Sequence, residues 1–275
     1  MGAAVGKCLT AHGAEVLTTL EGRSAASAAR AADAGMRPVP LQLLAGAEIL
    51  LSIVPPAAAL AFAEQIAPLL RDTPRKPLFV DCNAVSPATV LRIAAVIDAT
   101  GASFVDGGII GPPPQAGCAQ PSLYVSGSHA GLLHVLNGHG LDVRVLDGPV
   151  GAASALKLSF AGITKGFTAV ATTMILAASR VGATNELYKE LAAREPALLA
   201  TLSRKVPDML PKAYRWIAEM QEIAQFVTPD HAGEIYLGAS HIYERVARAV
   251  TDQGVEPETL RKFFAAAADG LEPDS

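Results

Sequence analysis

The stretch Leu78-Phe79-Val80-Asp81-Cys82-Asn83-Ala84-Val85-Ser86-Pro87 decides the fold, because a strand passes into a helix within ten residues. Residues 78–81 are apolar until the last position and predict a short buried strand. Ser86 is suited to cap a helix, and Pro87 to occupy its first position. We expect that helix to reach about Thr100. A strand followed directly by a helix is typical of a parallel α/β sheet.

The same alternation extends to both sides of this stretch. Further strands are predicted at 15–20, 49–54 and 103–106, and helices at 24–35 and 57–70. The strands lack polar alternation, as strands buried on both faces do. The sequence therefore predicts a Rossmann-like, doubly wound parallel sheet over residues 1–150.

The pattern changes near residue 150. After Gly148-Pro149-Val150-Gly151 the strand signals stop, and Ala152–Val181 predicts one long, mostly apolar helix. More helices follow, with breaks predicted at Pro196, Pro207, Pro211, Thr228-Pro229 and Gly254. We expect residues 151–275 to form an all-α domain.

Composition excludes several classes of function. The chain is 51% hydrophobic with a net charge of -4, so it has a core to bury and no basic surface for nucleic acid or membrane lipid. Three cysteines without a CxxC pair favour a reduced, cytoplasmic protein. No secretory signal is evident, and the uncharged run 166–179 is short for a membrane span. His231 and His241 lack metal-ligand spacing, so we predict no metal.

The amino terminus looks cut. A dinucleotide-binding domain should begin with a strand, a G-x-G-x-x-G loop and a helix. Here residues 1–6 are already helical in pattern. We expect Met1-Gly2 to be the tail of the glycine motif, with the first strand missing from this chain.

Several motifs occur in one order along nearly the whole chain: Met1-Gly2, Val54-Pro55, 81–87, 104–111 and 148–157. In this order and spacing the chain resembles the β-hydroxyacid dehydrogenases, which include the 3-hydroxyisobutyrate and 6-phosphogluconate enzymes. It is most similar to the branch whose helical C-terminal domain has no known function. The resemblance implies a homodimer with packed helical domains.

The resemblance makes Lys157 the catalytic acid/base, since it follows Gly148 and Gly151 as the family's lysine follows its G-x-x-G. A neutral lysine can accept the proton of a substrate hydroxyl, which requires a depressed pKa. The family's asparagine four residues on is Ala161 here. Lys165 shares the helix stripe, and we expect it to replace that partner. The alternative is that both lysines extend from the helix to solvent.

The resemblance also implies a nicotinamide cofactor. Gly22-Arg23-Ser24 aligns with a family signature, and Arg23 with Ser24 favours NADP, while Glu21 keeps NAD possible. The remaining expected cofactor residues are Gly2, Val54, Pro55, Asn83 and Lys212. For Lys212 an ordinary surface position is the alternative.

A Pro/Gly-dense loop is predicted at 107–117. The substrate loop of the family corresponds to residues 106–114, where Ile110 and Pro112 make the expected pocket more apolar and stiffer. The expected substrate residues are Gly107, Gly108, Ile109, Gly111, Ser122 and Lys165. We predict hydride transfer between nicotinamide and a small hydroxy acid, whose identity and possible decarboxylation stay open. The alternatives are an imine reductase-like enzyme, which Lys157 disfavours, and a non-catalytic dinucleotide-binding protein.

Overall fold

The structure is a computed structural model that describes residues 1–114, 121–228 and 231–265. The chain divides into two compact units, Met1–Leu158 and Ser159–Ser275. The end of the loop predicted at 107–117 (residues 115–117), Cys118 and the predicted break at Pro229 lie outside the described ranges.

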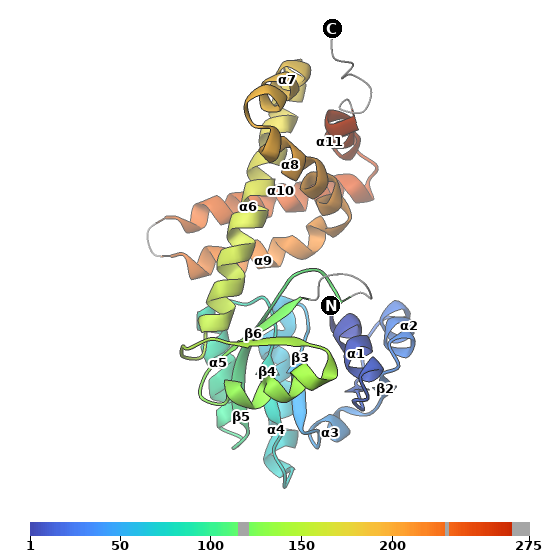
Figure 1. Cartoon of the computed structure of the whole chain (residues 1–275), viewed down its shortest axis with the longest axis vertical. Helices are drawn as coiled ribbons and strands as arrows, with labels where there is room; N and C mark the ends of the chain where they lie inside the picture. Colours follow the sequence, from blue (N-terminus) through green and yellow to red (C-terminus); the bar gives the residue numbers. More distant parts are fainter. Residues whose placement is uncertain (115–120, 229–230, 266–275) are drawn as a thin grey trace. The chain divides into compact units, whose positions relative to one another are not determined.

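The first unit alternates strands and helices (Figure 1). Its elements are α1 (Gly2–Ala11), β1 (Leu17–Thr18), α2 (Ala25–Asp33), β2 (Arg37–Pro38), α3 (Leu41–Leu44), β3 (Ile49–Ser52), η1 (Pro56–Ala58), α4 (Ala59–Asp72), β4 (Leu78–Asp81), α5 (Pro87–Asp98), β5 (Ser103–Ile110), β6 (Ser122–Ser126), η2 (Ala130–His139) and β7 (Asp142–Val145). The predicted cap at Ser86 is confirmed, because its hydroxyl accepts the backbone N–H of Thr89, and the hydroxyl of Ser24 caps α2 in the same way by accepting the N–H of Ser27. The predicted strands at 15–20 and 49–54 are shorter than expected.

In the described residues the strands form two sheets, β1-β2 and β3-β4-β5-β6-β7. Neighbours are parallel except for β5 and β6, which run antiparallel. The predicted Rossmann-like parallel sheet is confirmed, and β5–β6 is its one antiparallel pair in the described residues. The link from Ile110 to Ser122 is shorter than the crossover that a parallel pair needs.

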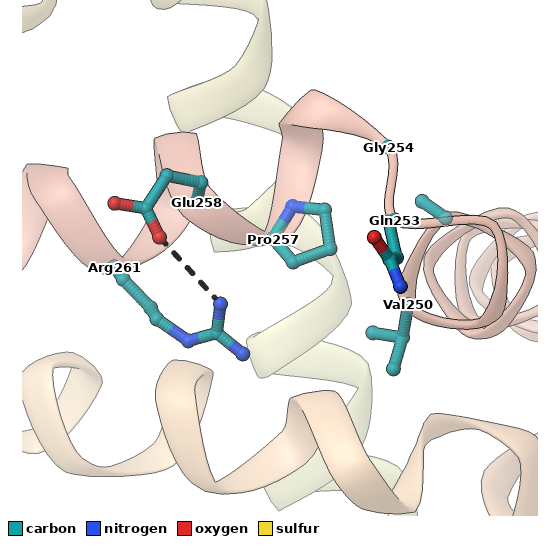
Figure 2. A pocket seen from close by; sticks show the side chains of 7 residues that line it. Val250, Gln253, Gly254, Pro257, Glu258 and Arg261 are labelled. Atoms are coloured by element: carbon teal, nitrogen blue, oxygen red, sulfur yellow. Dashed lines mark ion pairs between the residues drawn. The ribbon is translucent and has the colours of Figure 1, made fainter.

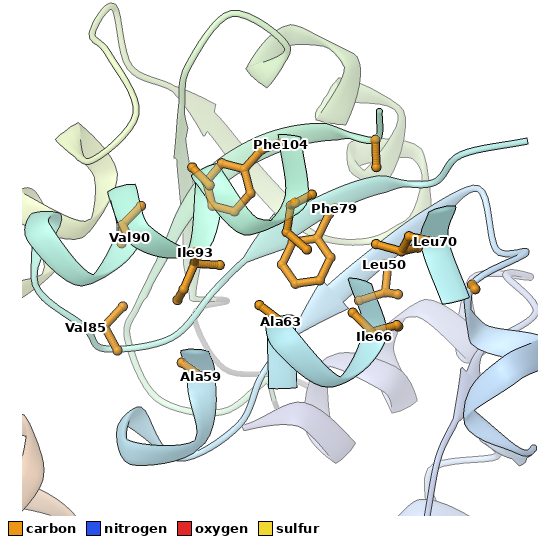
Figure 3. Close-up of a cluster of buried hydrophobic side chains, with 14 of the residues drawn as sticks. Leu50, Ala59, Ala63, Ile66, Leu70, Phe79, Val85, Val90, Ile93 and Phe104 are labelled. Carbon is orange, nitrogen blue, oxygen red and sulfur yellow. The ribbon is translucent and has the colours of Figure 1, made fainter. Parts of the chain in front are cut away.

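The larger sheet is covered on both faces. On one face α4 and α5 pack over strand side chains, and Phe79 stacks on Phe104 with ring centroids 6.0 Å apart (Figure 3). On the other face α1 and η2 contribute Val5, Leu9 and Leu133 to a second cluster. Burial on both faces explains why the strands have no polar alternation.

Strand β5 is longer than the sequence predicts. It continues through residues 107–110, which were expected to begin a loop, because β6 pairs with them. Gly107, Gly108 and Ile109 thus lie opposite Val125, Tyr124 and Leu123. Glycine weakens a strand unless a close neighbour requires it, and the site below supplies that neighbour.

The second unit is helical in its described residues. The long helix α6 (Ala152–Arg180) begins in the first unit and confirms the helix predicted at 152–181. The others are α7 (Thr184–Arg194), α8 (Pro196–Met209), η3 (Leu210–Lys212), α9 (Ala213–Phe226), α10 (Gly233–Thr251) and α11 (Val255–Ala265). The break predicted at Pro207/Pro211 falls between the two prolines, because α8 contains Pro207 and ends at Met209, where η3 begins. Helices α9 and α10 pack along each other (Figure 1).

By length and composition, α6 is the one helix of the described residues that could cross a membrane. The helix is longer than the uncharged run in the sequence suggested. Buried side chains line one side of it, among them Ala161, Ala169, Ile175 and Leu176. A core helix passes the same test of length and composition, so α6 is weak evidence for a membrane span.

Candidate functional site

The start of α6 is anchored on β5 by Asp106. Its Oδ2 accepts the backbone N–H groups of Gly151 (2.9 Å) and Ser154 (3.0 Å) and the hydroxyl of Ser126 (3.0 Å), and its Oδ1 accepts the hydroxyl of Ser154 (2.6 Å). An anion at a helix N-terminus satisfies amides that have no partner within the helix. Asp106 is fully buried, so the first turn of α6 is held in one place.

Gly108 allows α6 to approach the strand closely. A Cβ at this position would lie 2.8 Å from the carbonyl oxygen of Ala153 and 3.1 Å from the Cβ of Lys157. Real Cβ atoms essentially never come as close as the first distance. The glycine in β5 therefore gives Lys157 its position, and the reason for glycine here is packing within a strand.

Lys157 extends from α6 toward the carboxyl end of β4. Its Nζ donates to the carbonyl oxygen of Cys82 at 3.3 Å, and the side chain is half-buried. Cys82 belongs to the stretch 78–87, whose strand-to-helix pattern predicted the fold. Ligands of open α/β sheets bind at this edge of the sheet.

A buried polar row crosses the sheet beside this lysine. Ser52, Asp81, Asp106 and Ser126 are register partners on β3, β4, β5 and β6, and none is more than 1% exposed. Sequence reasoning did not select any of the four as functional. Each ends or interrupts an apolar strand, which was the available signal.

Asn83 joins this row to the loop that follows β3. Its Oδ1 accepts the N–H of Val54 at 2.7 Å, and its amide donates to the hydroxyl of Ser52 at 2.9 Å and to Asp81. The predicted cofactor residues Val54 and Asn83 are thus brought together, and Pro55 follows directly. The start of α1 lies at the same place, since a Cβ on Gly2 would be 3.7 Å from Ile53.

The residues predicted to hold the adenosine side lie after β1. Glu21 accepts the backbone N–H of Leu41 at 3.3 Å, and Ser24 caps α2. Arg23 is exposed to solvent. Of these three, the guanidinium of Arg23 is the most accessible to a phosphate.

The predicted substrate serine points to β7. Ser122 donates to the carboxylate of Asp142 at 2.6 Å, and this hydrogen bond, followed by that of Arg144, lowers the pKa of Asp142. Gly111 has a φ of 125°, and a Cβ there would meet Pro121 at 3.0 Å.

Lys165 and Lys212 belong to the second unit. Lys165 forms an ion pair with Glu219, and its Nζ lies 4.9 Å from the centre of the Trp216 ring. The hydroxyl of Tyr243 donates to the Lys165 carbonyl at 2.5 Å. Lys212 pairs with Asp208 one helical turn away, at 2.6 Å, on the surface.

A hollow in the second unit lies at the turn between α10 and α11 (Figure 2). Its lining includes Val250, Gln253 and Pro257. Glu258 and Arg261 also line it and form an ion pair, with 3.6 Å between Oε2 of Glu258 and Nη1 of Arg261. None of the predicted site residues lines it. Among the described residues no group of three or more His, Cys, Asp or Glu could hold a metal ion.

Two family models match separate stretches of the chain. Residues 1–137 match the family described as the NAD binding domain of 6-phosphogluconate dehydrogenase. Residues 178–246 match a domain of unknown function.

A curated relative is an uncharacterized 28.5 kDa protein encoded in the 7S RNA 5' region of Methanothermus fervidus. It is 30% identical over 217 residues, which are 78% of this chain and 82% of the relative.

Solved structures share the fold. A conserved protein of unknown function, described as structurally similar to 3-hydroxyacid dehydrogenases, is 26% identical with a TM-score of 0.66, and the match covers 90% of this chain and 94% of the other. A 3-hydroxyisobutyrate dehydrogenase of Mycobacterium tuberculosis, solved with L-serine, is 17% identical with a TM-score of 0.68, covering 95% of each chain.

Proposed function

The chain belongs to the β-hydroxyacid dehydrogenase family, and on that premise we propose that it transfers a hydride between a nicotinamide cofactor and a small hydroxy acid, with Lys157 as the general acid/base. One observation carries this proposal. The Nζ of Lys157 lies against the Cys82 carbonyl at the edge of the sheet where Val54 and Asn83 also meet. A titratable group at that edge can reach a ligand bound there.

The residues present fit a dinucleotide. The start of α1 lies over the end of β3, and the backbone amides of a helix's first turn suit a phosphate group. Val54, Pro55 and Asn83 would flank the nucleotide, and the exposed Arg23 with Ser24 would favour NADP over NAD, since Glu21 already accepts the Leu41 amide. When bound, the nicotinamide would accept or supply the hydride.

Lys157 would handle the proton. In the neutral form its amine accepts the proton of the substrate hydroxyl, and the resulting ammonium group stabilises the carbonyl oxygen that forms. We propose that the substrate lies beside Lys157 near Gly111. Gly107, Gly108 and Ile109 would support that position from within β5, and contacts of the substrate with Ser122, Lys165 or Lys212 stay predictions.

The test is a hydroxy-acid screen with NADP and NAD on the purified chain and on Lys157→Ala. We expect the substitution to lower kcat about 10²- to 10⁴-fold while NADPH binding, measured by fluorescence, is retained. Lys189→Ala, on an exposed α7 lysine, is the matched control. Cofactor binding without turnover of any hydroxy acid, unchanged in Lys157→Ala, would instead indicate a non-catalytic binding protein.

We also propose a homodimer through α6. Its exposed apolar side chains are spaced alternately three and four residues apart, as in a helix that packs on another helix: Phe160, Ile163, Phe167, Val170 and Met174. A second copy of the same stripe is a self-complementary partner. Ile163→Glu should convert the dimer into a monomer in sedimentation, whereas a wild-type monomer would contradict the proposal.

Cys8 and Cys82 are both free thiols, which supports a cytoplasmic location.

A further inference from the structure

Asp81 is a buried carboxyl group that the proposed chemistry does not yet use. It ends β4, is 1% exposed, and accepts the Asn83 amide through Oδ1. Its Oδ2 has no hydrogen-bond partner among the described residues. Buried polar atoms are normally satisfied, so an unsatisfied one at the edge of a binding site calls for a role.

Three titratable groups surround this carboxyl. Asp106 is its register partner on β5, Cys82 follows it directly after the end of β4, and Lys157 approaches from α6. The pKa of Asp81 is raised to about 7, chiefly because the carboxyl group is buried. The charge of Asp106 contributes to this rise, whereas the Asn83 hydrogen bond and the charge of Lys157 reduce it. Burial also raises the pKa of the Cys82 thiol well above its usual range, so this neighbour stays neutral.

The two carboxyl groups, Asp106 and Asp81, differ in what they can do for Lys157. Both oxygens of Asp106 already accept the donors of Ser126, Gly151 and Ser154. Asp81 keeps one oxygen available, and the carbonyl that Lys157 contacts belongs to the adjacent residue.

We propose that Asp81 is a positioning residue for Lys157, whose ionised carboxylate is the counter-charge that stabilises the ammonium form of the lysine. The inference rests on the proposed function only in taking Lys157 as the acid/base. An ionised Asp81 makes Lys157 a stronger base and stabilises the ammonium that forms when the lysine takes the substrate proton, while it reduces the fraction of lysine that is neutral beforehand. A protonated Asp81 no longer stabilises the ammonium form, so Lys157 should become a weaker base as Asp81 takes up a proton.

The experiment measures the titration of Lys157 on the whole chain without cofactor or substrate. Lysines are reductively methylated with ¹³C-formaldehyde, and the Lys157 resonance is identified by its absence from Lys157→Arg. Asp81→Asn should lower the pKa of Lys157 by about one unit or more, the usual effect of an opposite charge nearby. Glu219→Gln, which removes the carboxylate paired with Lys165, should leave it unchanged. An unchanged Lys157 titration in folded Asp81→Asn would overturn the proposal.

A reciprocal measurement covers the case in which Asp81→Asn does not fold. In Lys157→Met the ¹³C-carboxyl resonance of Asp81 should titrate about one unit or more higher than in the wild type. Equal pKa values for Asp81 in the two proteins would overturn the proposal. Neither readout needs turnover, so the coupling between Asp81 and Lys157 can be tested even in a chain without dehydrogenase activity. An active chain without this coupling would reject the role of Asp81 and leave the proposed function standing.

Discussion

Two lysines on α6, eight residues apart, have very different surroundings. Lys165, in the second unit, forms a direct ion pair with Glu219, lies against the Trp216 ring, and belongs to a helical core. Lys157, in the first unit, donates to a backbone carbonyl, which carries no net charge. The charge of Lys165 is compensated within its own unit, whereas the position of Lys157 at the edge of a sheet beside a buried carboxyl supports our proposal that it transfers a proton.

The largest expected effect is on the anchor that puts Lys157 in place. Asp106→Ala should leave the buried N–H and hydroxyl groups around it unsatisfied. We expect the free energy of unfolding to fall by about 3–5 kcal/mol, measured by urea titration with circular dichroism. Asp142→Ala, at a more exposed carboxylate in the same unit, is the control and should cost less. Equal losses in the two variants would show that Asp106 does not hold α6.

The next effect is a pH dependence that should be confined to the first unit. The pKa of Asp81 is about 7 in the fold and about 3.9 in an unfolded chain. Between about pH 4 and 7 the folded chain therefore binds a proton that the unfolded chain does not. The stability contributed by this proton is full below pH 4 and is lost as pH rises to 7.

Asp81→Asn is neutral at every pH and should remove this dependence. From pH 4 to pH 7 the unfolding free energy of the wild type should fall relative to the variant, by an amount approaching about 4 kcal/mol. Urea titrations at several pH values measure it. Parallel pH curves for the two proteins would contradict a raised pKa at Asp81.

A smaller loss is expected from the second lysine's partner. Glu219→Gln leaves the Lys165 ammonium, whose side chain is 22% exposed, without its counter-charge. We expect a loss of about 1–3 kcal/mol, because the group can still reach some water. Trp216 is the single tryptophan and lies against Lys165, so its fluorescence during urea unfolding reports on this unit.

The smallest effect serves as the control for that variant. Glu190 and Arg194 form an ion pair on α7 with side chains 66% and 78% exposed. Glu190→Gln should change the free energy of unfolding by less than about 0.5 kcal/mol, as expected for a pair in water. A loss as large as that of Glu219→Gln would mean that burial is not what separates the two pairs.

Much of the architecture could be predicted from neighbouring residues. Ser86 was expected to cap a helix and does so, and the long helix after Gly151 lies where it was predicted. Such signals act within one turn of chain, so they survive in any tertiary context. The length of β5 was underestimated, because residues 107–110 become a strand only by pairing with β6.

The position of Lys157 in the family motif, and the α/β-then-helical order of the chain, were determined by the sequence alone. Its surroundings were not. The carbonyl that it contacts lies 75 residues earlier, and the row of Ser52, Asp81, Asp106 and Ser126 exists only through the register of four strands. Lys165 was expected to tune Lys157, but its charge is paired with Glu219, 54 residues later. Register and packing arise from contacts distant along the chain, and only the tertiary structure brings those residues together.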